Sequence, residues 1–211
     1  MTLYLQQTRL VISELRRHAP YTAMGTLTGI AIMLLVIELD IPKSISSTLF
    51  WTFHPLHVVL SALVTTGVYR LHAEGKPLYS AVLVGYLGSV GIATLSDSII
   101  PYAGEWLLDL PNRGIHIGFI EKWWLVNPLA LLGVVAGYFY PKTTFPHFGH
   151  VLLSVWASLF HIIMALGYAI TPGMLLYIAL FLFLAVWIPC CTSDIVFPLL
   201  WVRKPDLSTT V

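Results

Sequence analysis

Charged residues are scarce in this chain, since Asp, Glu, Lys and Arg together make up only 10% of its 211 residues. Soluble domains carry about 25% charged residues, so the composition excludes an ordinary soluble protein. The formal net charge is +1 at pH 7, and the basic residues form no tract. Binding to nucleic acid requires clustered Lys and Arg, and we therefore expect no nucleic-acid partner.

Cysteine is also scarce, because the chain has only Cys190 and Cys191, which are adjacent. Neighbouring cysteines in a helix rarely meet the geometry of a disulfide. We therefore expect two reduced thiols that pack as small apolar side chains. Any further role for them stays open.

Long apolar runs are what the chain has instead. Hydrophobic residues make up 57% of the sequence, and a helix needs about 20 apolar residues to cross a bilayer. The sequence thus predicts an all-α integral membrane protein with six transmembrane helices. The six apolar stretches are residues 21–39, 50–70, 79–100, 123–140, 148–169 and 174–202.

The remaining segments and the basic residues predict how the chain sits in the bilayer. Residues 1–20 form an expected amphipathic helix on the membrane surface, residues 109–122 an outer connecting segment at the interface, and residues 203–211 a cytoplasmic tail. With the N-terminus inside, eight of the eleven Lys and Arg residues face the cytoplasm, as the positive-inside rule favours. We therefore expect both termini in the cytoplasm and a bacterial or archaeal inner (plasma) membrane, and a homodimer stays open.

A polar signature occurs twice within the apolar segments. Residues 54–61 read HPLHVVLS, and residues 147–154 read HFGHVLLS. A serine-aspartate pair closed by proline also occurs twice, as SDSIIP at 96–101 and SDIVFP at 193–198. Imidazole and carboxylate groups are costly to place in lipid, so a duplicated set of them indicates a function.

The repeat predicts two units of three spans, residues 21–108 and 123–202. Because three is an odd number, the second unit runs in the opposite direction to the first. We therefore expect two inverted three-helix repeats, an architecture typical of secondary transporters. The first span of each unit also has two glycines four residues apart, a spacing that favours close contact between membrane helices. These glycines are Gly25, Gly29, Gly133 and Gly137.

The duplicated histidines and aspartates are candidate metal ligands. Histidines three residues apart lie on the same side of a helix, and an aspartate from a neighbouring span supplies negative charge for a divalent cation. Imidazole with carboxylate suits zinc, iron(II) or manganese better than calcium or magnesium. The topology places the first set in the outer half of the membrane and the second in the inner half. Whether the two sets form two separate sites or one central site stays open. The six candidates are His54, His57, Asp97, His147, His150 and Asp194.

Hydroxyl side chains continue the histidine faces of the second and fifth spans. This polar stripe predicts an inward-facing helix side, as a path for water or ions requires. Pro101 and Pro198 lie four residues after the two aspartates, and their missing N–H groups free the aspartate carbonyl oxygens. The expected pathway-lining residues are Ser61, Thr65, Ser96, Ser154, Ser158, Ser193 and His161.

These patterns favour a membrane transporter or channel for a divalent transition-metal cation, with zinc, iron(II) or manganese bound at the two His-x-x-His plus Asp sets. One alternative is an intramembrane metal-dependent enzyme that acts on a lipid through a metal-activated water. Equal completeness of the two sets counts against an enzyme, which needs only one. A second alternative is a proton-coupled carrier of a small solute that binds no metal.

Overall fold

The computed structural model describes residues 2–73, 77–141, 144–167 and 170–202, without the side chains of residues 2–11, 14, 17, 144–147, 191, 194 and 195. Within these ranges every regular element is helical and no strand occurs, so the predicted all-α class is confirmed. The predicted tail, residues 203–211, lies outside the described residues. The elements are α1 (Thr2–Glu38), α2 (Lys43–His72), α3 (Leu78–Thr94), the π-helix η1 (Leu95–Ile99), α4 (Ile100–Leu107), α5 (Gly118–Glu121), α6 (Trp123–Phe139), α7 (Thr144–Ala165), α8 (Pro172–Cys191), the π-helix η2 (Thr192–Val196) and α9 (Phe197–Leu200).

Five helical segments of the described chain are long and apolar enough to cross a membrane, which indicates membrane integration. Helix α6 is apolar but has 17 residues, about 26 Å at 1.5 Å per residue, so the sixth span at 123–140 stays a prediction. The surface helix expected at 1–20 also stays a prediction, because α1 continues through Pro20 without a break. The five segments are His18–Glu38, Lys43–His72, Leu78–Leu107, Phe148–Ala165 and Pro172–Cys190.

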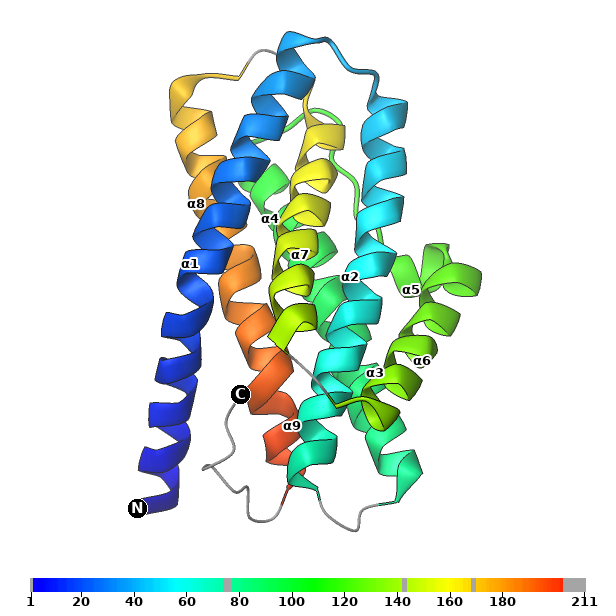
Figure 1. The fold of residues 1–211 in the computed structure, drawn as a ribbon. Helices are drawn as coiled ribbons and strands as arrows, with labels where there is room; N and C mark the ends of the chain where they lie inside the picture. The colour runs from blue at the N-terminus through cyan, green and yellow to red at the C-terminus, as the bar shows by residue number, and fades with distance from the viewer. Residues whose placement is uncertain (1, 74–76, 142–143, 168–169, 203–211) are drawn as a thin grey trace.

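The helices run alternately up and down in the orientation of Figure 1. Helix α1 rises, α2 descends and α3–η1–α4 rises, whereas α6 descends, α7 rises and α8–η2–α9 descends (Figure 1). Helix α2 packs against α3, α6 and α7, while α7 also packs against α1 and α8. Side chains of α2, α7 and the lower part of α8 therefore meet in the interior.

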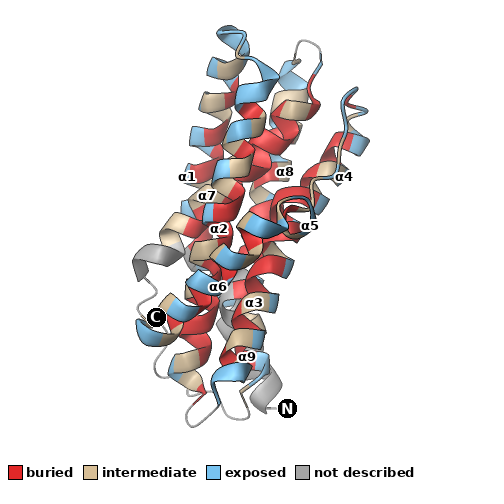
Figure 2. Ribbon diagram, turned by 90° about the vertical axis from the view of Figure 1, so that its right-hand side faces the viewer, coloured by how far each residue is buried: buried red, intermediate tan, exposed pale blue. Residues whose placement is uncertain are grey.

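The bundle encloses a buried polar group among apolar core clusters, and its outer face is apolar. Buried residues follow the inner helix faces and exposed residues the outer ones (Figure 2). Large apolar side chains such as Leu27 and Leu176 are 73% and 74% exposed, whereas His57 and Asp97 are fully buried. This distribution suits a bilayer, where hydrocarbon solvates the outer face and the interior must satisfy the polar groups.

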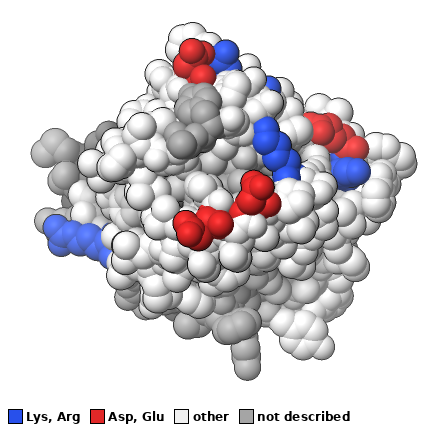
Figure 3. Space-filling model, turned by 90° about the horizontal axis from the view of Figure 1, so that it is seen from above, with Lys and Arg blue, Asp and Glu red and all other residues white. Residues whose placement is uncertain are grey.

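Charged side chains are sparse at the upper end of the molecule. Seen from above, the Lys and Arg side chains lie scattered among Asp and Glu, without a continuous patch of one sign (Figure 3). The turn between α1 and α2, for example, carries Glu38, Asp40 and Lys43 close together in sequence. The described residues on this face therefore show no one-signed charge of the kind that steers ions over long distances.

Glycines on α6 allow this helix to lie directly on the backbone of α2. A Cβ atom added at Gly133 would stand 2.3 Å from the carbonyl oxygen of Val59, and one at Gly137 would stand 2.3 Å from that of Leu63. The close contact expected from the glycine spacing is thereby confirmed for this pair. Because α6 holds α2 on one side, it helps to fix the face of α2 that points to the interior.

Both serine-aspartate pairs lie in π-helical segments. In η1 the N–H of Ile100 donates to the carbonyl oxygen of Leu95, five residues back, in place of the usual four. Pro101 follows at once and has no N–H to donate. The segment η2 holds the second pair and precedes Pro198 in the same way. The sequence repeat therefore corresponds to a repeat in local helix geometry, and π-turns of this kind often mark functional sites.

Candidate metal centre and its buried polar column

Asp97 lies at the centre of a buried hydrogen-bond group. Its Oδ2 atom accepts from Nδ1 of His54 at 3.0 Å and from Nδ1 of His57 at 2.7 Å. Its Oδ1 atom accepts from the hydroxyls of Ser96 at 2.7 Å and Ser154 at 2.8 Å. The two histidines reach one oxygen because they lie three residues apart on the same side of α2. All five side chains are 0–1% exposed, so this carboxylate is satisfied by protein groups alone.

The bonds to Asp97 determine which nitrogen of each histidine is free to bind something else. An ionised carboxylate only accepts hydrogen bonds, so each ring bonds to it through Nδ1–H, and Nε2 is the ring nitrogen that is not bonded to Asp97. A carboxylate behind a histidine is a common support for a metal-binding Nε2. In this arrangement Asp97 is positioned to orient both histidines, and its expected role as a metal ligand stays a prediction.

His57, His150 and Cys190 form a cluster with the geometry of a metal site. One ligand atom from each lies within 4.8 Å of the others, and all three residues are buried. The rings of His57 and His150 are stacked, with centroids 5.7 Å apart and an interplanar angle of 10°. The Sγ atom of Cys190 lies 3.9 Å from Nε2 of His57. Helices α2, α7 and α8 thus each supply one candidate ligand.

This cluster joins the two predicted histidine sets. His57 belongs to the first unit and His150 to the second, so the histidines meet in the interior in place of two well-separated groups. The side chains of His147 and Asp194 lie outside the described residues, and their expected role as ligands stays a prediction. The structure therefore describes the side chains of four of the six candidates. It adds Cys190 as a further candidate ligand beside His57 and His150.

Cys190 is a residue that the sequence interpretation treated as packing. It lies three residues before Ser193 and four before Asp194, so on a helix it shares their side. That spacing could have indicated that Cys190 belongs to the same polar face. A cysteine is also among the most often buried residue types, which makes packing the default interpretation when no partner is known.

The residues of the predicted polar stripe form a buried column of two groups of hydrogen-bonded hydroxyls, one on each side of the metal cluster. The hydroxyl of Ser158 donates to the carbonyl oxygen of Ser96 at 2.9 Å, and that of Ser154 lies 3.2 Å from Ser96 Oγ. On the other side of the metal cluster, Ser193 Oγ lies 3.4 Å from Ser61 Oγ and 3.3 Å from Thr65 Oγ1. The six hydroxyl residues of the predicted pathway are at most 1% exposed. The column follows α2 and α7 above and below the His57–His150 stack.

Above the Asp97 group lies a second carboxylate–histidine pair. Nδ1 of His161 is 2.6 Å from Oε1 of Glu105, and both side chains are buried. The backbone N–H of Gly114 donates to Oε2 of Glu105 at 3.3 Å. The sequence interpretation included His161 but gave no site role to Glu105. Its position eight residues after Asp97 on the same helical segment could have indicated a shared face.

The segment expected to connect the two units covers the upper part of this column. Leu110 is fully buried, and the side-chain amide of Asn112 donates to the carbonyl oxygen of Leu166 at 3.2 Å. Gly118 lies so close to His54 that a Cβ atom there would stand 2.3 Å from Nε2 of the ring. Residues 110–118 thus pack on the end of α7 and on His54.

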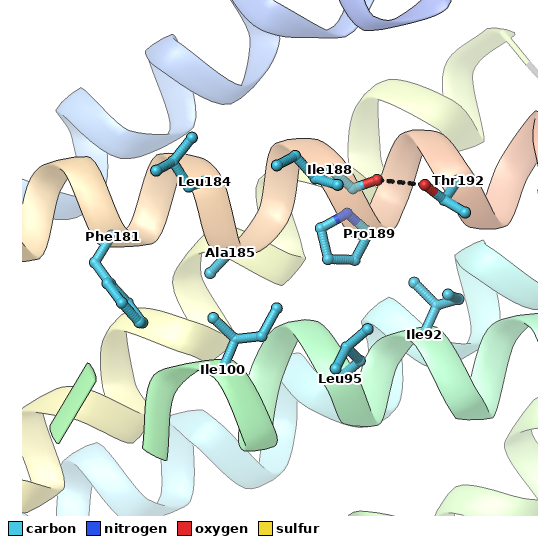
Figure 4. A pocket seen from close by; sticks show the side chains of 9 residues that line it. All are labelled: Ile92, Leu95, Ile100, Phe181, Leu184, Ala185, Ile188, Pro189 and Thr192. Atoms are coloured by element: carbon cyan, nitrogen blue, oxygen red, sulfur yellow. Dashed lines mark hydrogen bonds between the residues drawn. The ribbon is translucent and has the colours of Figure 1, made fainter. Parts of the chain in front are cut away.

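An apolar groove lies between α8 and the α3–η1–α4 segment. It has a volume of about 350 Å³, and the α8 side chains face those of the opposite segment across it (Figure 4). Leu95 and Ile100 flank Asp97 in the sequence, and Pro189 precedes Cys190. The groove therefore lies beside the helical segments that carry Asp97 and Cys190. Its lining residues are Ile92, Leu95, Ile100, Phe181, Leu184, Ala185, Ile188, Pro189 and Thr192.

The chemistry of this centre follows from the described side chains. Two imidazoles and a thiol in one buried cluster form a nitrogen and sulfur ligand set, which suits a transition metal. A helical membrane bundle by itself does not define an activity, because one architecture hosts many functions. Comparison of the chain with protein-family models, with curated proteins and with solved structures finds no match.

Proposed function

We propose that this protein is a membrane transporter of a divalent transition-metal cation, with His57, His150 and Cys190 as the central binding site. The observation that carries the proposal is the convergence of three buried ligand atoms within 4.8 Å. The bond of 2.7 Å from His57 Nδ1 to Asp97 adds the orienting carboxylate that such ligands use.

The ligand set narrows the choice of cation. Thiolate and imidazole favour zinc and iron(II), whereas manganese prefers oxygen ligands. Three protein ligands leave a position open for water or for ligand exchange, in contrast to a closed structural site. Because the thiol binds as a thiolate, metal uptake releases a proton. We therefore propose zinc or iron(II) ahead of manganese.

The buried polar column supports transport more than storage. Hydroxyl groups lie above and below the cluster, at Ser154 and Ser158 on one side and at Ser61 and Ser193 on the other. Hydroxyls of this kind can replace water around a moving cation in the membrane interior. The proposed path therefore runs along α2 and α7 through the His57–His150 stack.

The proposed transporter has six spans in two inverted three-helix repeats. Opposite chain directions in α1–α4 and α6–α9 (Figure 1), and a π-helix in the third helix of each unit, support this arrangement. Inverted repeats with a central site and interrupted helices are typical of secondary transporters. The proposal includes both termini in the cytoplasm and a bacterial or archaeal inner membrane, on the distribution of Lys and Arg.

Metal content and metal flux test this function together. Purified wild-type protein should bind one zinc ion per chain and carry zinc into proteoliposomes. His57→Ala and Cys190→Ala should lose both properties, whereas His72→Ala, a histidine at the lower end of α2, should keep them. Wild-type protein that stays metal-free in the presence of zinc and shows no flux would contradict the proposal.

A second candidate is an intramembrane metalloenzyme that acts on a lipid, and the apolar groove favours it. The groove of about 350 Å³ is large enough for part of a ligand, and it borders the segments that carry Asp97 and Cys190. His57 and His150 also lie in one shared cluster, and a single metal site is what an enzyme with one active site requires. In this case zinc-loaded protein should turn over lipid in detergent, and Ala185→Phe, which fills the groove, should stop turnover but leave zinc bound.

A further inference from the structure

Two buried histidine nitrogens without a hydrogen-bond partner lie beside the same aromatic ring. They are Nε2 of His54 and Nε2 of His161, each on a ring that is 1% exposed. The ring of Phe50 is stacked on that of His54, at 5.5 Å between centroids and 12° between planes, and lies edge to face with that of His161 at 5.4 Å. A buried lone pair without a partner is costly, so each nitrogen is a candidate acceptor for a cation.

Two partly exposed polar side chains, His116 and Glu121, lie on the surface side of His161. The ring of His116 lies 5.2 Å from that of His161, and Nδ1 of His116 is 3.3 Å from Oε2 of Glu121. The side chains of His116 and Glu121 are 32% and 40% exposed. His116 is therefore the partly exposed side chain next to His161, and the ring of Phe50 contacts the rings of both His161 and His54.

The groups around His161 leave it one strong electrostatic partner. On α4 that partner is Glu105, while His116, in the segment before α5, contacts the ring of His161, and Glu121 of α5 pairs with His116. Among the described residues, α1 and α8 contribute Met33, Ile178 and Leu182 to the same apolar surroundings. Lys122 lies over the ring of Trp51 at 5.6 Å, and Arg113 pairs with Asp109 at 3.1 Å.

We propose that the Glu105–His161 pair is a proton-binding site in exchange with the upper surface through His116, with Phe50 as the barrier between this site and the Asp97 group. The proton binds at Nε2 of His161 and leaves from the same atom. The neutral ring beside a carboxylate has a net charge of −1, and the protonated ring beside it has a net charge of zero. The unprotonated pair therefore attracts a divalent cation into the column, and the protonated pair does not.

The coupling of this proton to metal movement rests on the proposed transport function, but proton binding itself does not. Metal-free protein in liposomes, labelled with nitrogen isotope at histidine, reports both ring nitrogens by solid-state NMR. His161 should change from a neutral to a doubly protonated ring when the pH is lowered from neutral to acidic values. His161→Gln assigns the signal.

Two carboxamide variants make the test specific. Glu105→Gln removes the partner of His161 and should abolish the change of its signal in this pH range. Glu121→Gln is the matched control, because Glu121 pairs with His116, and it should leave the His161 change in place. A His161 ring that keeps one protonation state in wild-type protein, or that titrates equally in Glu105→Gln, would overturn the proposal. A second zinc ion that binds to wild-type protein and is lost in His161→Gln would also overturn it, because His161 would then bind metal and not a proton.

Zinc uptake into proteoliposomes tests the coupling separately. Wild-type uptake should be at least roughly tenfold slower at acidic than at neutral pH, because the protonated pair lacks the unit negative charge that attracts the divalent cation. Glu105→Gln should flatten this dependence, and Glu121→Gln should keep it. Absence of zinc uptake in all proteins would count against transport, and the NMR titration would still decide whether the pair binds a proton.

Discussion

The two carboxylate–histidine groups of the column differ in how completely the protein satisfies them. Asp97 accepts hydrogen bonds from two histidines and two serines. Glu105, eight residues further along the same helical segment, accepts from His161 and from the backbone N–H of Gly114. A saturated carboxylate fixes the geometry of its partners, whereas a less saturated one near a half-exposed His116 leaves its histidine open to exchange. The difference agrees with the two proposed roles, a support for a metal ligand at Asp97 and a proton site at Glu105.

The two groups also differ in the elements that supply their hydrogen-bond partners. Asp97 lies in the π-helix η1, between α2 and α7, where both histidines and Ser154 converge on it. Glu105 lies in α4 below the connecting segment, whose backbone supplies one of its two hydrogen bonds. A partner on a loop is more easily displaced than one on a packed helix. Proton exchange needs such freedom, and metal coordination does not.

Asp97→Ala is the change with the largest expected effect. It leaves two buried imidazoles and two hydroxyls without their acceptor, and breaking a buried pair of this kind costs about 3–5 kcal/mol. Loss of the orienting carboxylate should also weaken zinc binding by roughly 10- to 100-fold. Thermal unfolding in detergent and a zinc titration measure the two effects.

Glu105→Ala is the control for that change, because it removes the other buried carboxylate of the same segment. It should weaken zinc binding at the His57 cluster far less than Asp97→Ala does. Equal losses of zinc affinity in the two variants would show that Asp97 has no special role as a support, and the contrast between the two groups would fail.

Gly118→Ala should disturb the Asp97 group from the side of the connecting segment. The added Cβ atom would stand 2.3 Å from Nε2 of His54, so the ring must shift against its bond to Asp97. Overpacking of this kind costs about 1–3 kcal/mol. Gly114→Ala is the matched control beside the Glu105 group, because its Cβ atom would lie 3.5 Å from Nε2 of His116, an ordinary contact. Melting temperatures should fall for Gly118→Ala and stay nearly unchanged for Gly114→Ala, and a reversed order would contradict the packing argument.

Ser158→Ala should have the smallest effect. Its hydroxyl donates to the carbonyl oxygens of Ser96 and Ser154 at 2.9 and 2.8 Å, and interhelical hydrogen bonds in membranes contribute about 0.6 kcal/mol on average. Ser154→Ala removes a bond to the carboxylate of Asp97, and charge-assisted bonds are roughly twice as strong. Unfolding measurements should therefore rank Ser154→Ala as the more destabilising. A larger loss for Ser158→Ala would contradict the greater strength assigned to the hydrogen bond between Ser154 and the Asp97 carboxylate.

Much of the fold and part of the centre could be predicted because local patterns govern them. Apolar runs of span length and histidines three residues apart identify the helices and place His54 and His57 on one face. Glu105 was assigned no site role because a single carboxylate near a span end resembles an interfacial residue. Only the packing of α4 on α7 shows that it meets His161, which is 56 residues further along the chain.

The sequence by itself determined that the chain forms apolar helices with a repeated set of imidazole, carboxylate and hydroxyl groups turned to one side. Composition and helical period act within a few residues, and no partner is needed to read them. Tertiary structure decided that His57 and His150 of different units share one cluster, that Cys190 joins it and that Asp97 stands behind the histidines. These contacts depend on how whole helices pack, including the glycines that let α6 lie on α2. Helix packing is set by the summed shape of many side chains, and for that reason spacing along the chain leaves such pairings open.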